Sequence, residues 1–388
     1  MRKVAVVGIG MTKFGVAEKT AMELFAEAAA DAIDDAGITT KDIEALFFSN
    51  VLGFFSEGMG NPAPFAAAEL GLQDIPSTRF EGACATGSVA IRDAYMWVAS
   101  GFYDVVLVAG TERVCNMGTP FATRTFAMGH DSYYEQFTGL TFPGVFAMIA
   151  HLYSKKYGIP LQKLKEQMAL VAVKNHANAL LNPKAHFHKK ITVEDVLNSV
   201  MICDPLQLYD CCPFSDGAAA IILASEEKAK KMTDTPIYIA GAGQSSAGPL
   251  FRQKDITITQ ARITSSRMAY KQAKVEPKDI DIVELHDCFT IAEMVATEAL
   301  GFFNFGEGGK AVEEGRTRID GDIPINPSGG LKAKGHPVGA TGIAQAAEIV
   351  LQLRGEADKR QVKDAEIGLT HNIGGSGASC VVHIMEVV

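Results

Sequence analysis

The hydrophobic and polar positions of the chain alternate between short apolar runs and longer amphipathic stretches. The chain opens with RKVAVVGIGMTKFG, an apolar run followed by glycines, and PIYIAGAGQSSAG near residue 236 has the same form. Both patterns predict a buried strand that ends in a glycine-rich turn. The amphipathic stretches between such runs predict helices. Strands that alternate with helices of this length indicate an α/β fold with parallel-rich, helix-covered sheets.

The second half of the chain weakly repeats the first, which constrains the architecture further. The tripeptide KDI at 41–43 recurs at 278–280, each time just before an apolar run. ACATGSVAIRDAYMWVASG from Ala83 corresponds to HPVGATGIAQAAEIVLQLRG from His336, and each predicts a small-residue turn that opens a helix. SDGAAAIILAS and GSGASCVVHIMEV correspond as closing strands. We therefore predict two similarly wound halves.

One long segment has no counterpart in the repeat. We predict an N-terminal half at 1–117 and 191–232, an inserted loop or lid domain at 118–190, and a C-terminal half at 233–388. The insertion is rich in Phe, Met, Tyr and Gly. An insertion of this length favours a functional lid or an interface. An ordinary helical subdomain without contact to a site is the alternative.

Composition and charge narrow the class of function. The 388 residues are 47% hydrophobic and 21% charged, enough for a substantial core. The net charge of −9 argues against a nucleic-acid or anionic membrane surface, so that an anionic ligand would need a local positive site. Neither a signal segment nor a run of membrane-spanning length is present, which predicts a cytoplasmic protein. The seven scattered cysteines, without a CxxC pair, indicate reduced thiols.

Cys84 and His336 are the first candidates for chemistry. Cys84 in GACATGS stands where a strand gives way to a helix, and a helix N-terminus favours thiolate over thiol. His336 in KGHPVGATG occupies the equivalent turn of the second half. In a pseudo-symmetric fold the two turns face each other, and a Cys beside a His suits nucleophilic thioester chemistry. A buried structural cysteine and a plain turn histidine are the alternatives.

His286 and Cys288 in ELHDCF follow the strand-like run IDIVEL. Titratable residues at the carboxyl end of a parallel strand fit the crevice where such sheets bind ligands. Zinc ligation by residues 286–288 competes with this interpretation, but adjacent ligands alternate in direction and no complementary pair stands near. We expect no metal site here.

The segment NIGGSG, residues 372–377, follows the strand-like run EIGLT and offers free backbone amides to a developing oxyanion. A plain glycine turn is the alternative. His151, His186 and His188 fit surface or packing positions. No GxGxxG, P-loop or HExxH pattern occurs, so we expect neither nicotinamide nor ATP, and no permanently bound cofactor.

Taken together, GACATGS, HDCF, GHPVGATG and NIGGSG resemble, in this order, the thiolase superfamily, especially its SCP2-type and archaeal acetoacetyl-CoA thiolase branches. The resemblance covers essentially the whole chain and includes DPLQLYDCCPFSDGAAA. It implies a five-layered αβαβα fold of two pseudo-symmetric halves with mixed sheets, plus an inserted loop domain. It also implies an acetyl-CoA C-acetyltransferase that uses coenzyme A thioesters as substrates.

By this resemblance, Cys84 accepts an acyl group and His336 activates its thiol. The carbanion of a second acyl-CoA then attacks the thioester in a Claisen condensation. One oxyanion hole would use the N–H groups of Cys84 and Gly374, with Gly375 and Asn372 in the same segment. The other would use His336 and, through a water, His286.

The sequence departs from better-known thiolases at Asn372, where those enzymes carry a second catalytic cysteine in a CxGGG segment. The resemblance to the SCP2-type branch implies Cys288 as the acid/base, two residues beyond His286 on the same side of an extended segment. His371 and a structural Cys288 remain alternatives. Cys380 fits a strand interior.

The resemblance further implies a homodimer or a dimer of dimers, and a role in HMG-CoA and mevalonate synthesis. The archaeal branch suggests a complex with HMG-CoA synthase and a small OB-fold, zinc-ribbon protein. The chain shows no evident basic pocket for the CoA phosphates; Lys332, Lys334 and Arg124 are the nearby candidates. A β-ketoacyl synthase, a thiolase-fold aldolase or lyase, and a non-catalytic acyl-CoA-binding scaffold are the alternative functions.

Overall fold

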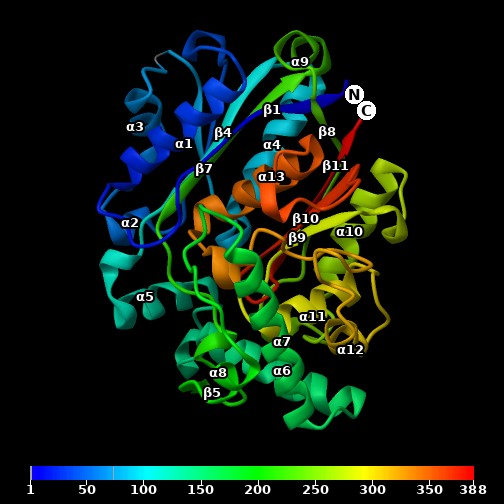
Figure 1. Ribbon diagram of the computed structural model, residues 1–388. Helices are drawn as coiled ribbons and strands as arrows, with labels where there is room; N and C mark the ends of the chain where they lie inside the picture. Colours follow the sequence, from blue (N-terminus) through cyan, green and yellow to red (C-terminus); the bar gives the residue numbers. More distant parts are fainter. Residues whose placement is uncertain (1, 73) are drawn as a thin grey trace.

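A computed structural model describes residues 2–72 and 74–388 (Figure 1). Its main feature is a nine-stranded mixed sheet with the order β3-β2-β4-β7-β1-β8-β11-β10-β9. The strands are β1 (Val4–Met11), β2 (Leu46–Ser49), β3 (Ser77–Phe80), β4 (Val105–Glu112), β7 (Gly217–Ser225), β8 (Ile237–Ser246), β9 (Ile282–Leu285), β10 (Ile367–Gly374) and β11 (Ser379–Val387). A separate small sheet pairs β5 (Met201–Cys203) with β6 (Leu206–Gln207).

The pairing directions repeat between the two sides of the large sheet. In the first half β1 and β4 pair antiparallel with β7, and β2 pairs parallel with β4. In the second half β8 and β10 pair antiparallel with β11, and β9 pairs parallel with β10. The halves meet at β1 and β8, through the pairs Ala5–Tyr238 and Val6–Ile237. The structure therefore confirms the α/β fold with mixed sheets and a duplicated winding.

The helices also repeat between the halves. They are α1 (Ala21–Asp35), α2 (Gly53–Ser56), α3 (Pro62–Glu69), α4 (Thr86–Ser100), α5 (Thr119–Phe126), α6 (Phe142–Tyr157), α7 (Leu161–Ala179), α8 (Val193–Leu197), α9 (Glu226–Met232), α10 (Gln260–Ala273), α11 (Thr290–Ala299), α12 (Gly308–Glu313) and α13 (Val338–Arg354). Helices α4 and α13 lie between the two halves of the sheet, and α1 and α10 cover the outer faces (Figure 1). This is the αβαβα layering that the resemblance implies.

The first two glycines of each opening segment lie inside a strand and not in the predicted turn, whereas Gly15 and Gly248 lie beyond the strand ends. A Cβ atom at Gly10 of β1 would lie 2.0 Å from the carbonyl oxygen of Ala28 in α1. At the equivalent Gly243 of β8, a Cβ atom would lie 1.9 Å from the carbonyl oxygen of Ser265 in α10. These glycines therefore let each outer helix pack directly on its strand.

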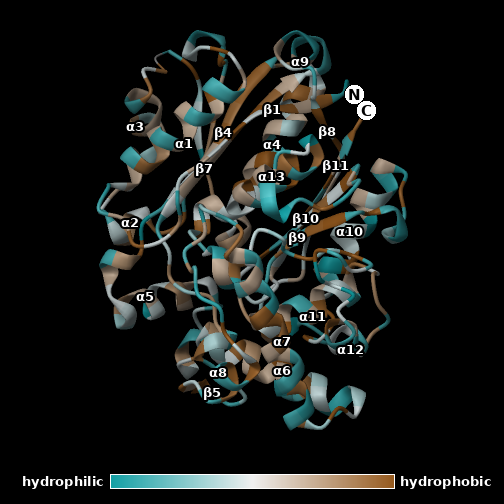
Figure 2. Cartoon of the chain, in the orientation of Figure 1, coloured by the Kyte–Doolittle hydropathy of each residue, from teal (hydrophilic) through white to brown (hydrophobic). Residues whose placement is uncertain are grey.

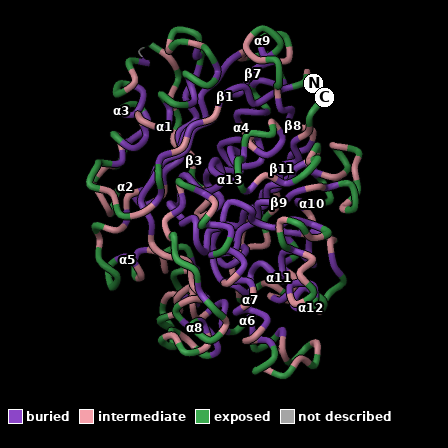
Figure 3. Tube along the Cα trace, in the orientation of Figure 1, coloured by how far each residue is buried: buried purple, intermediate pink, exposed green. Residues whose placement is uncertain are grey.

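The apolar positions of the strands form the interior, as Figure 2 shows for β4, β7, β9 and β11. The central helix α13 is buried around almost its whole circumference (Figure 3). The inserted helices α5, α6 and α7 extend below the layered body in Figure 1. In the described part of the chain, no helix combines the length and apolarity needed to cross a membrane.

Candidate active site

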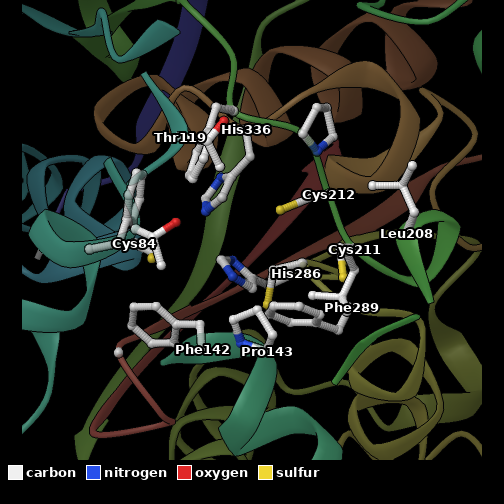
Figure 4. Close-up of a pocket in the computed structure, with 17 residues that line it drawn as sticks. Cys84, Thr119, Phe142, Pro143, Leu208, Cys211, Cys212, His286, Phe289 and His336 are labelled. Carbon is white, nitrogen blue, oxygen red and sulfur yellow. The ribbon is translucent and has the colours of Figure 1, made fainter. Parts of the chain in front are cut away.

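A cavity of about 340 Å³ lies between the two halves and the insertion (Figure 4). Cys84 from the first half faces His286 and His336 from the second half across it. Ligand atoms of these three side chains, one per residue, all lie within 4.8 Å of one another. The structure thus brings together three of the residues that the sequence proposed for chemistry, from two equivalent turns and one strand end.

Cys84 lies in a single 3₁₀ turn, Ala83–Ala85, directly before α4. Ala83 has a φ of 50°, in the left-handed region. The hydroxyl of Thr86 supports this turn, because it accepts from the N–H of Gly82 at 2.7 Å and donates to the carbonyl of Ala83 at 2.6 Å. The local bonds therefore hold Ala83, the residue before the nucleophile candidate, in a strained conformation at the cavity wall.

The acidity of Cys84 differs from the prediction. The helix position favours a thiolate, but burial outweighs it and raises the pKa of the Cys84 thiol to about 12, even though the backbone N–H of Gly375 donates to the sulfur and lowers it. Desolvation penalises the charged form more than one helix N-terminus favours it. In the free protein Cys84 is therefore a thiol that needs a neighbouring base.

His336 fits this requirement because its ring orientation is fixed. The hydroxyl of Thr341 lies 2.7 Å from His336 Nδ1 and donates to the carbonyl oxygen of Pro337 at 2.9 Å. A hydroxyl has one proton, so Nδ1 must donate to Thr341, and Nε2 keeps its lone pair. Burial lowers the pKa of His336 to about 3, which keeps the ring neutral at physiological pH.

Asp287 ties the strand end that bears His286 to the turn before His336. It accepts from the N–H of Leu331 at 2.6 Å and from Nδ2 of Asn175 at 2.7 Å. The bond to Leu331 therefore fixes the turn at Gly330–Lys334 relative to the HDCF segment. Burial raises the pKa of Asp287 to about 7.

His286 is oriented by a chain of amides that begins at a backbone carbonyl. Gln345 Nε2 donates to the carbonyl of His371 at 3.2 Å, which leaves its Oε1 to accept from Asn372 Nδ2 at 3.0 Å. Asn372 Oδ1 then faces His286 Nδ1 at 2.9 Å, so Nδ1 must be the donor. The lone pair of His286 thus lies on Nε2. Burial and the neighbouring His336 lower the pKa of His286 well below its usual range.

Asn372 therefore has a different position from the one predicted. It lies inside β10, fully buried, and contacts the back of the His286 ring, outside the cavity lining. The predicted strand EIGLT continues to Gly374 because the β10–β11 pairing extends to the pair Gly374–Ser379. Gly375, not Gly374, reaches the cavity wall, and its N–H donates to Cys84.

Cys288 lines the same cavity and is 8% exposed. Burial raises the pKa of its thiol well above the usual range, while the buried guanidinium of Arg262 lowers it. Arg262 is 2% exposed, and its Nε has no hydrogen-bond partner among the residues that the structure describes. The acidic groups that act on it are the thiols of Cys288 and Cys380. Cys380 is itself fully buried in β11.

Two predicted candidates for phosphate contacts are wrong, because burial removes them from solvent. Lys332 and Lys334 are each 1% exposed. Lys334 Nζ pairs with Glu284 Oε2 at 3.3 Å, and Lys332 Nζ lies 3.4 Å from His176 Nε2. Arg124 is exposed on α5, next to the cavity-lining Thr123.

The alternative base His371 lies behind the cavity. It is fully buried on β10, and its Nδ1 accepts from the backbone N–H of His286 at 3.4 Å. His186 and His188 contact Ser215 and the carbonyl of Asn182, and His151 pairs with Asp204 at the surface. The described lining of the cavity includes none of these four histidines.

Sequence reasoning missed much of the apolar wall. The insertion contributes Thr119, Thr123, Phe126, Phe142 and Pro143, and the segment after it contributes Ile202, Leu208, Cys211, Cys212, Pro213 and Phe214. Cys212 reaches the site because its N–H donates to the carbonyl of Cys288 at 2.9 Å. The adjacent cysteines in DCCPF were a visible signal in the sequence. The sequence did not show that this segment pairs with HDCF.

The fold and site together define a class: a duplicated α/β protein whose two halves present a cysteine and a neutral histidine to one apolar cavity. Comparison with known proteins agrees. The pattern described as "Thiolase, N-terminal domain" matches residues 4–227, and "Thiolase C-terminal domain-like" matches residues 242–387. The chain belongs to the thiolase superfamily.

Its relatives include two archaeal proteins named "Acetyl-CoA acetyltransferase". The protein from Methanothermobacter thermautotrophicus is 49% identical over 100% of both chains, and that from Methanocaldococcus jannaschii is 42% identical over 100% of this chain and 99% of its own. "Sterol carrier protein 2" of Bos taurus is 37% identical over 98% of this chain and 71% of its own.

Solved structures show the same fold. The "Ltp2-ChsH2(DUF35) aldolase" superposes with a TM-score of 0.84 at 28% identity, over 99% of this chain and 98% of that one. Human mitochondrial 3-ketoacyl-CoA thiolase in complex with CoA gives a TM-score of 0.76 at 20% identity, over 100% and 98% of the chains.

Proposed function

We propose that this protein is an acetyl-CoA C-acetyltransferase that condenses two acetyl-CoA molecules reversibly to acetoacetyl-CoA and free CoA. The observation that carries the proposal is the convergence of Cys84, His286 and His336 within 4.8 Å in one cavity. The full-length similarity to proteins of this name supports the substrate. No permanently bound cofactor takes part in the proposed reaction.

In the first half-reaction, His336 Nε2 takes the proton of the Cys84 thiol. The thiolate attacks the acetyl-CoA carbonyl carbon, and the N–H groups of Cys84 and Gly375 hold the resulting oxyanion. The high pKa of Cys288 makes it a proton donor at this point, so it protonates the departing CoA sulfur. The products are acetyl-Cys84, free CoA, a Cys288 thiolate and a protonated His336.

In the second half-reaction, the Cys288 thiolate removes a proton from the methyl carbon of a second acetyl-CoA. The enolate oxygen accepts a hydrogen bond from His336 Nε2–H and from a water whose other proton is held by His286 Nε2. The carbanion attacks acetyl-Cys84, the thioester breaks, and His336 returns its proton to the Cys84 sulfur. Each group regains its starting state, and Arg262 stabilises the Cys288 thiolate between the two steps.

Intact-protein mass spectrometry after mixing with acetyl-CoA tests this proposal. The wild type should gain one acetyl group and Cys84→Ala should gain none. Cys288→Ser should still form the adduct, more slowly, but make no acetoacetyl-CoA. No adduct on the wild type while CoA still binds would contradict the proposal. The aldolase or lyase function and the scaffold function would then be the leading alternatives.

The aldolase reading has one specific observation in its favour, the TM-score of 0.84 with an aldolase. An aldolase needs no acyl-cysteine intermediate, so the mass measurement separates the two functions. A scaffold would likewise leave Cys84 without an acetyl group.

The proposal extends to a complex. No Lys or Arg stands among the described residues that line the cavity, so the CoA phosphates lack a cationic contact there. A small OB-fold, zinc-ribbon partner would supply that surface, with HMG-CoA synthase consuming the product for mevalonate synthesis. A homodimer or dimer of dimers in the cytoplasm belongs to the same proposal. The seven free cysteines support a reducing compartment.

A further inference from the structure

The three groups that meet in the cavity also form a set of zinc ligands. One sulfur and two imidazoles are the donor types that Zn²⁺ prefers, and Cys₂His and His₃ sets with an open fourth position are known zinc geometries. All three ligand atoms here are buried and lie within 4.8 Å of one another. They come from the 3₁₀ turn Ala83–Ala85, the end of β9 and the start of α13.

Both imidazoles have the hydrogen-bonding pattern of zinc-binding histidines. A ligating histidine donates its second ring N–H to a fixed acceptor, which orients the ring and fixes the tautomer. Here His336 Nδ1 donates to Thr341 Oγ1 at 2.7 Å, and His286 Nδ1 donates to Asn372 Oδ1 at 2.9 Å. In each ring the remaining lone pair is on Nε2.

The size of the site is close to what the ion needs. Zn–S bonds of about 2.3 Å and Zn–N bonds of about 2.0–2.1 Å in a tetrahedron place ligand atoms roughly 3.3–3.6 Å apart. The three side chains would therefore close by roughly 1 Å. The fourth position faces the cavity, where water or the thiolate of free CoA fits.

We propose that Cys84, His286 and His336 bind Zn²⁺ in the resting protein as an inhibitory ion. Zinc replaces the proton of the Cys84 thiol, which passes to solvent, and it occupies the Nε2 lone pairs of both histidines. The nucleophile and its base are then unavailable together. The binding follows from geometry alone, whereas its inhibitory effect rests on the proposed function.

Titration of the reduced, full-length protein with Co²⁺ tests the site without requiring turnover. We expect one ion per chain, a thiolate-to-cobalt charge-transfer band in the near ultraviolet, the intense visible bands of tetrahedral cobalt, and displacement by Zn²⁺. Cys84→Ser should abolish the charge-transfer band. Zn²⁺ should also protect Cys84 from iodoacetamide, as read by peptide mapping.

Two sets of variants make the assignment specific. Thr341→Val and Asn372→Leu remove the acceptors behind the rings and should weaken zinc binding roughly 10- to 100-fold. Cys288→Ser is the matched control, since this cavity cysteine lies outside the three-ligand group and should keep the band. Circular dichroism and thermal unfolding confirm that each variant is folded.

Each outcome decides the point. A band that survives Cys84→Ser, a band that disappears in Cys288→Ser, or no band in the wild type would overturn the zinc site. An acetyl adduct without cobalt binding would overturn zinc and keep the acetyltransferase. Cobalt binding without an acetyl adduct would keep the zinc site and contradict the acetyltransferase.

Discussion

At the scale of single residues, the two histidines of the site share one design. Each ring donates from Nδ1 to a buried acceptor and keeps a lone pair on Nε2. The acceptors differ, however: Thr341 acts alone on His336, whereas Asn372 acts on His286 through an amide chain anchored by Gln345. Each ring is therefore oriented by its own hydrogen-bond partners, although both rings act on the enolate oxygen in the proposed second half-reaction.

The pKa of Cys84 leads to a prediction for its alkylation. Because burial raises this pKa to about 12, the thiolate fraction at neutral pH is small and rises as pH rises towards that value. The iodoacetamide rate at Cys84, followed by peptide mapping, should increase about tenfold per unit from pH 7 to pH 9.

An unstructured, end-capped peptide with one Cys, whose thiol pKa is about 8.5, is the control, and its rate should begin to level off towards pH 9. A Cys84 rate that is already constant at pH 7 would show a resting thiolate and contradict the assignment.

Asn372→Leu should separate the two half-reactions. The change removes the acceptor of His286 Nδ1–H, so the ring can adopt the other tautomer and no longer orients the water at the enolate oxygen. Condensation should fall roughly 100-fold, because one oxyanion contact is lost. Acetylation of Cys84 should change only a few-fold, since Thr341 still fixes His336.

Asn372→Asp, which keeps an oxygen acceptor towards His286, should retain the tautomer in ¹⁵N NMR spectra of the imidazoles. Equal losses in acetylation and condensation for Asn372→Leu would indicate a general structural role instead.

At the scale of elements, the site depends on how closely α4 and α13 approach. A Cβ atom at Gly342 of α13 would lie 2.4 Å from the backbone nitrogen of Ser88 in α4. Both helices end at a glycine in the left-handed region, Gly101 and Gly355, with φ of 89° and 75°. The two equivalent helices thus begin just after Cys84 and His336 and end in the same way. Their close approach at Gly342 sets the distance between the two residues.

Gly342→Ala should therefore push the two helices apart. We expect the free energy of unfolding to fall by about 1–3 kcal/mol, a range typical of overpacking, and Cys84 acetylation to slow. Urea denaturation and the acetyl-CoA mass assay measure the two effects.

Gly60→Ala is the control, because the nearest atom to its added Cβ lies 3.8 Å away and little should change. A Gly342→Ala variant with full stability and normal acetylation would refute the close-packing argument.

At the scale of the whole molecule, the cavity that holds Cys84, His286 and His336 has no Lys or Arg among its described lining residues. Lys332 and Lys334 are buried in the interior. Lys334 pairs with Glu284, and Lys332 lies next to His176. Arg124 stays at the surface of α5. The overall charge of −9 adds no long-range attraction for an anionic substrate.

A small OB-fold, zinc-ribbon partner should accordingly lower the KM for acetyl-CoA. One or two charge-assisted phosphate contacts correspond to roughly tenfold or more in affinity. Steady-state kinetics with and without the partner measure the change.

Acetyl-pantetheine, which lacks the nucleotide phosphates, is the matched substrate control and should show no dependence on the partner. A partner that leaves both KM values unchanged would remove the argument for a shared CoA surface.

The sequence alone determined the duplicated winding of the fold and the main residues of the candidate site. The repeat of apolar runs and small-residue turns predicted two equivalent halves, and symmetry then placed Cys84 opposite His336, because equivalent helix starts meet across such a junction. The position of His286 and Cys288 after a strand predicted their place at the same edge.

Tertiary structure decided what depends on partners far away in the chain. Burial turned the expected thiolate of Cys84 into a thiol and withdrew Lys332 and Lys334 from the site. It also made Asn372 a support for His286, and it buried Arg262 where its charge acts on Cys288. Local patterns encode which face of an element is apolar, but the depth of burial and the hydrogen-bond partner of a polar group are set only when distant elements pack together.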